Sequence, residues 1–111
     1  MALYCVGPLP ADALAAAAQF HAEDLPKIRQ TLGAASSPQF TIVFAPADHT
    51  HRAWQLAATQ GLARQHAPLR INAIESDDDA AIAAAAAYLA SAGGVTGQFL
   101  PLDSLGAGKV V

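Results

Sequence analysis

The sequence has one cysteine and no long apolar run, and each shortage excludes a class of protein. Cys5 has no partner within the 111 residues, so no internal disulfide can form. The longest apolar run, Ala80–Ala87, is far shorter than the roughly 18 residues that a membrane span needs. Because no basic segment followed by a long apolar run opens the chain, we expect no secretory signal, no membrane partner and a cytoplasmic location.

Charge is also scarce. Charged residues make up 14% of the chain, against about 25% in an average soluble domain. The six lysines and arginines are scattered and the net charge is -3, so the basic footprint of a nucleic-acid-binding protein is missing. We therefore expect no nucleic acid among the partners.

Apolar residues are abundant, at 53% of the chain, but many of them are alanine. The length suits a single domain, which we place at residues 1–103, followed by a tail at 104–111. An alanine-rich core is thin, with helices lying close to the sheet. Self-association would add the burial that a monomer lacks.

Short apolar runs alternate with helical patterns along the chain. The predicted strands are residues 2–6, 40–45, 69–74 and 98–102, and the predicted helices are 10–32, 50–66 and the segment between Ser76 and Gly93. Pro26 is expected to break or kink the first helix, with Asp24 capping its second piece. Asp48 or Thr50 is expected to cap the next helix.

This order predicts an α/β, Rossmann-like, three-layer fold, in which a parallel sheet of about four strands is covered on both faces by helices in right-handed crossovers. In such sheets ligands bind beyond the carboxyl ends of the strands. Here those ends are residues 7–10, 45–51 and 75–79.

Two segments resemble the short-chain dehydrogenases/reductases. Residues 62–74, which read LARQHAPLRINAI, are similar to a helix ending in Leu-Ala-Arg-Glu that runs into a strand reading Arg-Val-Asn-Ala-Ile. Residues 88–91 (YLAS) and 95–103 (VTGQFLPLD) resemble the family's Phe-Leu-Ala-Ser and Thr-Gly-Gln segments. The resemblance covers about residues 38–103, and it implies the C-terminal half of a Rossmann-like enzyme that uses NAD(P).

The sequence departs from that family at the residues that carry its chemistry. The Gly-rich turn that receives the pyrophosphate is missing. The family's catalytic tyrosine falls on Asp48 and its lysine on Arg52, and we expect these two side chains to pair with each other. An aspartate that is already ionised cannot donate the proton that a tyrosine donates. Asp48 and Arg52 are thus weak catalytic candidates, and no catalytic residue is assigned.

Asp48, His49, Thr50 and His51 form a polar cluster with two interpretations. A His-x-His pair beside a carboxylate can hold a metal ion, but no distant third ligand is evident, so we assign no metal and favour capping of the helix. His49, His51 and Glu75 are the ligand-binding candidates, because they lie at the carboxyl ends of predicted strands.

A stripe of one large and several small residues follows on the same helix: Trp54, Ala57, Ala58, Gly61 and Leu62. Packing on the sheet and contact with a partner helix are equally open. In the family that the chain resembles, this helix and the one before it form a four-helix bundle across a dimer, which favours the stripe as an interface.

Two hypotheses follow. The first is a non-catalytic α/β protein without cofactor that self-associates as a dimer or tetramer, or binds another partner. The alternative is an oxidoreductase-related or small-ligand-binding protein that uses the Asp48–Arg52 region, with NAD(P) as its cofactor.

Overall fold

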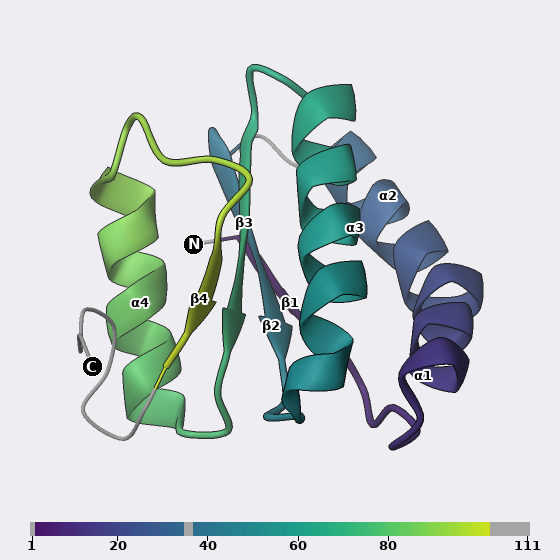
Figure 1. Cartoon of the computed structure of the whole chain (residues 1–111). Coiled ribbons are helices and arrows are strands. Elements are labelled where there is room, and N and C mark those ends of the chain that lie inside the picture. Colours follow the sequence, from purple (N-terminus) through teal and green to yellow (C-terminus); the bar gives the residue numbers. More distant parts are fainter. Residues whose placement is uncertain (1, 35–36, 103–111) are drawn as a thin grey trace.

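The computed structural model describes residues 2–34 and 37–102 as four strands alternating with helices (Figure 1). The strands are β1 (Leu3–Cys5), β2 (Gln39–Phe44), β3 (Arg70–Glu75) and β4 (Phe99–Pro101), and the helices are α1 (Ala13–Gln19), α2 (Leu25–Ala34), α3 (Arg52–Gln65) and α4 (Asp79–Ser91). The predicted Rossmann-like α/β fold is confirmed. The predicted tail, residues 104–111, lies outside the described residues. No helix within the described ranges has the length and apolar character to cross a bilayer.

The sheet has the order β1-β2-β3-β4, and all neighbouring strands are parallel. Every residue of β2 is buried, as the unbroken apolar run predicts. β1 is an edge strand, and its Leu3 and Cys5 are exposed. Cys5 is exposed although it belongs to an apolar strand, because α4 packs on β2 and β3 and leaves that face of β1 uncovered.

The helices form two layers around the sheet. Figure 1 shows α1, α2 and α3 on one face and α4 on the other. Because the strand order advances in one direction throughout, crossovers on opposite faces have opposite hands. The connection from β3 through α4 to β4 is the left-handed one, so the expectation that every crossover is right-handed is wrong here.

Arg70, the first residue of β3, holds the end of α4 against the sheet by hydrogen bonds. Its guanidinium donates hydrogen bonds to the carbonyl oxygens of Leu89, Ala92 and Ala90 at 2.8, 2.7 and 3.3 Å. Leu89 O and Ala92 O also accept from the backbone N–H groups of Ala92 and Val95, at 3.3 and 3.1 Å, so the guanidinium adds a second donor to each at the end of the helix. The arginine thus acts as a C-terminal cap from a distant strand, and α4 itself has no basic residue in its last turn.

Asn72, two residues further along β3, holds the loop that leads to β4. Its side chain is fully buried, donates to the carbonyl of Val95 at 3.0 Å and accepts from the backbone N–H of Gln98 at 3.0 Å. Gly97 has φ +73°, a conformation that favours glycine. The Arg-x-Asn segment that carries much of the family resemblance therefore serves the architecture of this chain.

Two apolar clusters fill the space between sheet and helices. The larger, under α1–α3, contains Val6, Phe20, Ile28, Leu32, Phe40, Ile42, Phe44, Leu62, Ile71 and Ala73. The smaller, under α4, contains Val43, Ile74, Ala85 and Leu89. The α4 side is the thin, alanine-rich layer that the composition predicts.

The first helical segment departs from α-helical geometry just before Pro26, at residues 20–24. Helical backbone continues from Ala13 to Ala34 through a π-helical turn at Phe20–Asp24, where Leu25 N–H bonds to Phe20 O. The wider turn accommodates Pro26, which has no N–H and whose ring clashes with a regular α-turn. Asp24 is not a cap: it is buried and accepts a 2.8 Å hydrogen bond from the Tyr4 hydroxyl.

Candidate functional site

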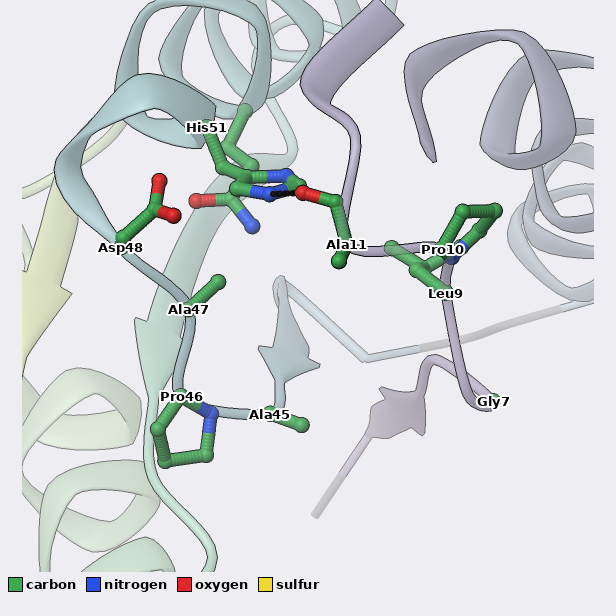
Figure 2. Close-up of a pocket in the computed structure, with 10 residues that line it drawn as sticks. Gly7, Leu9, Pro10, Ala11, Ala45, Pro46, Ala47, Asp48 and His51 are labelled. Atoms are coloured by element: carbon green, nitrogen blue, oxygen red, sulfur yellow. Dashed lines mark hydrogen bonds between the residues drawn. The ribbon is translucent and has the colours of Figure 1, made fainter. Parts of the chain in front are cut away.

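A pocket of about 240 Å³ opens at the carboxyl ends of β1 and β2 (Figure 2). It lies at the carboxyl ends of the strands, where a ligand site was predicted, between the segment after β1 and the segment after β2. Its lining is Gly7, Leu9, Pro10, Ala11, Ala45, Pro46, Ala47, Asp48, His51 and Gln55. The wall is mainly apolar, and polar side chains come only from the start of α3 and the turn before it.

Asp48 caps the 3-10 turn His49–His51 that leads into α3. Its carboxylate accepts hydrogen bonds from the backbone N–H of Thr50 at 3.0 Å and from the Thr50 hydroxyl. The hydrogen bonds from the Thr50 hydroxyl and from its backbone N–H hold the pKa of Asp48 below its usual range. Asp48 is therefore an ionised carboxylate at neutral pH and cannot act as a proton donor.

The two histidines do not converge. His49 is exposed, whereas His51 is buried with both ring nitrogens occupied. His51 Nε2 lies 2.9 Å from the carbonyl oxygen of Ala11, and its Nδ1 accepts from Trp54 Nε1 at 3.3 Å. This pattern requires the tautomer with the proton on Nε2. His51 thus links α3 to the segment before α1, as the dashed bond in Figure 2 shows.

Arg52 turns away from Asp48. Its Nη2 lies 3.8 Å from Glu75 Oε1, and its guanidinium carbon lies 4.8 Å from the centroid of the Phe99 ring. The expected Asp48–Arg52 pair is therefore wrong: Glu75, at the end of β3, provides the opposing charge. The other oxygen of Glu75 accepts a 3.1 Å bond from Ala47 N–H. Glu75 and Arg52 together brace the loop after β2, and neither lines the pocket.

Gln55 is the polar pocket residue that the sequence reasoning missed. It is 2% exposed, and its Oε1 has no hydrogen-bond partner among the described residues. The available signal was spacing: Gln55 lies four residues after His51 and four before Thr59, which places it on the buried face of α3. The absence of a partner has no local sequence signal.

The predicted interface stripe faces a second hollow, a groove of about 280 Å³ between α2 and α3. Leu62 is buried, Trp54, Ala58 and Gly61 are half-buried, and Ala57 is exposed. Trp54 packs on Phe20 and the larger core cluster, so this end of the stripe takes part in packing within the chain. Arg29 of α2 donates to Gln65 of α3 at 3.3 Å and closes one end of the groove.

The pocket does not suit the pyrophosphate of a dinucleotide. Phosphate cradles are built from backbone N–H groups, but Pro8, Pro10 and Pro46 supply none, and Ala47 N–H already binds Glu75. No lysine or arginine is among the described residues that line the pocket. The residues present therefore do not fit NAD(P) at this position.

The Asp48–His51 cluster does not have the arrangement of a metal site either. Within residues 2–34 and 37–102, no three histidine, cysteine, aspartate or glutamate side chains gather as a metal site would require. The arrangement can cap helices, brace a loop and offer acceptors to a small ligand. It contains no proton donor paired with a lysine.

Comparison with known proteins supplies one match. The family model described as "Short chain dehydrogenase-like protein" matches residues 4–102. No curated protein and no solved structure matches the chain.

Proposed function

Because the chain belongs to the short-chain dehydrogenase-like family, we propose that it is a non-catalytic member that self-associates through the helix pair α2 and α3. The orientation of Arg52 carries the first part of this proposal. A family enzyme needs a cation beside its proton donor, whereas here Arg52 is turned to Glu75 and Phe99, and Asp48 is committed to capping. The pair that would transfer a proton is thus replaced by two structural residues.

Gly61 supports self-association through α3. A glycine inside a helix costs about 1 kcal/mol relative to alanine, so a packing reason is expected for it. Apart from the adjoining residues and the backbone of α3 itself, no atom of the described residues lies within 4 Å of the position that a Cβ would take at Gly61. The space that the glycine leaves open lies on the α2–α3 groove, and a helix of a second copy can approach closely there.

The oligomeric state tests this proposal. Light scattering after size-exclusion chromatography is expected to give a dimer or tetramer at micromolar concentration. Ala57→Glu places a charge on the exposed stripe and is expected to yield a monomer. Ala84→Glu makes the same change on the exposed face of α4, on the other side of the sheet, and is expected to leave the oligomer intact. A wild-type monomer would contradict self-association.

Cofactor binding tests the non-catalytic assignment. Titration with NADH and NADPH, followed by fluorescence, is expected to show no saturable binding up to millimolar cofactor. Saturable micromolar binding would favour the alternative, an oxidoreductase-related protein. We propose the cytoplasm as its location, because a lone exposed thiol such as Cys5 suits a reducing compartment.

A further inference from the structure

The outer edge of β1 is an open row of backbone hydrogen-bonding groups. Among the described strands, β1 pairs with β2 alone. Ala2 O and Val6 N–H, which flank β1, bond to β2 at 3.0 and 2.9 Å. Successive residues of a parallel strand direct their backbone groups to its two sides alternately, so the N–H and C=O groups of Leu3 and Cys5 point away from β2.

The two edges of the sheet differ in their protection against another strand. At the β4 edge, Gln98 O and Leu102 N–H bond to β3 at 2.8 and 3.0 Å, so the backbone groups of Phe99 and Pro101 point outward. Pro101 has no N–H, and a proline on an edge strand hinders pairing with another chain. β1 contains neither a proline nor a charged residue. The outer edge of β1 is therefore the edge that can accept another strand.

The outward groups of β1 are complementary to those of a second copy of the same strand. In an antiparallel pair centred on Tyr4, Leu3 of each copy lies opposite Cys5 of the other. Residues that lie opposite each other at such a position exchange both of their backbone hydrogen bonds. Every outward N–H and C=O of Leu3 and Cys5 thereby gains a partner, and a twofold axis relates the two copies, as in most protein dimers.

The side chains on this strand also favour the pairing. Leu3 is 38% exposed and Cys5 is exposed, and both lie on the face of β1 that α4 leaves uncovered. Across the pair, the leucine of one copy would lie beside the smaller cysteine of the other, and both would lose contact with water. Tyr4 points to the opposite face, where its hydroxyl is bound to Asp24.

We propose that the outer edges of β1 in two copies of this chain pair antiparallel, centred on Tyr4, and join their sheets into one. The paired segment is short, well below the size of the interface in a stable dimer, so we expect a dissociation constant in the millimolar range. At micromolar concentration only the contact through α2 and α3 is expected, and at millimolar concentration those dimers are expected to join through β1. The β1 contact does not rest on the α2–α3 contact, so either can fail without the other.

Nuclear magnetic resonance of the ¹⁵N-labelled full chain carrying Ala57→Glu tests this contact apart from α2 and α3. As the protein is concentrated from the micromolar to the millimolar range, the amide signals of Leu3 and Cys5 are expected to shift saturably and their hydrogen exchange to slow. The amide signal of Phe99, at the outer edge of β4, is expected to stay in place. Signals that do not change with concentration, or changes confined to α3 or β4, would overturn the proposal.

Further variants of the same Ala57→Glu chain test the backbone hydrogen bonds. Cys5→Pro removes an outward N–H and leaves the bonds between β1 and β2 in place, because proline is tolerated on an edge strand where its nitrogen faces solvent. It is expected to weaken the association at least tenfold. Cys5→Ala keeps the N–H and is the matched control, with association expected to be nearly unchanged. Equal association of these two variants would contradict pairing through the backbone.

Charged pairs test the register and do not depend on proline. Leu3→Lys combined with Cys5→Lys places like charges opposite each other in the proposed pair and is expected to abolish the association. Leu3→Lys combined with Cys5→Glu places each lysine opposite a glutamate of the other copy and is expected to restore it. Equal association of the two double variants would refute the pair centred on Tyr4, even if Cys5→Pro did not fold.

Discussion

Replacing Arg70 by methionine is expected to lower the free energy of unfolding by about 2–4 kcal/mol, since a hydrogen bond to a charged group contributes about 1.5–3 kcal/mol. Two of its bonds, to Leu89 O and Ala92 O, are short, and the third, to Ala90 O, is long at 3.3 Å. Because Arg70 is only half-buried, we take the lower part of the range for each short bond. Methionine keeps most of the apolar stem, so the loss reports on the guanidinium.

Urea unfolding followed by circular dichroism measures this loss. With a slope of about 2 kcal/mol per molar, a typical value for a small protein, the midpoint is expected to fall by about 1–2 M. Arg70→Lys keeps a charge but not the planar fork, so about half of the loss is expected. Arg64→Met, at an exposed position of α3, is the matched control and should stay within about 0.5 kcal/mol of wild type.

The location of the effect provides a second readout. Hydrogen exchange in Arg70→Met is expected to quicken first at the end of α4 and in the loop that Asn72 holds, because those backbone groups lose their anchor. If the free energy of unfolding of Arg70→Met lies within about 0.5 kcal/mol of the wild-type value, the guanidinium does not cap α4. The stabilising role given to Arg70 would then be wrong.

The remaining predictions concern the side chains of Gln55 and Tyr4. Gln55→Leu is expected to raise the free energy of unfolding by about 1 kcal/mol, because it removes a buried acceptor without a partner among the described residues; a thermal melt showing clear destabilisation would mean that Gln55 Oε1 is satisfied in solution. Burial, together with the hydrogen bond to Asp24 and its charge, raises the pKa of Tyr4 from 10.0 to about 12. The unfolded chain therefore loses this proton first, and stability should decline as the pH rises from 10 to 12. In urea titrations, Tyr4→Phe is expected to reduce this pH-dependent loss of stability. Tyr88 is 54% exposed, so Tyr88→Phe is expected to leave the loss unchanged.

The sequence by itself determined the order of the elements and the parallel sheet, because these follow from signals that lie within short segments. The apolar run Phe40–Phe44 predicts a strand buried on both faces, and β2 is such a strand. Asp48 is followed at once by the turn that it caps, so its role is local and could be predicted. The carboxyl ends of the strands also gave the position of the pocket.

Only the tertiary structure decided which groups meet. Arg52, in α3, has Asp48 close by in sequence, yet it pairs with Glu75 at the end of β3. Arg70 and Asn72 contact the end of α4 and the loop after it, at backbone about 20 residues away. The π-helical turn before Pro26 contains Asp24, which Tyr4 contacts from β1. Among the residues that the structure describes, Gln55 Oε1 lacks a partner because the surrounding elements close around it. Such contacts join residues far apart in the chain, and a local pattern carries no information about them.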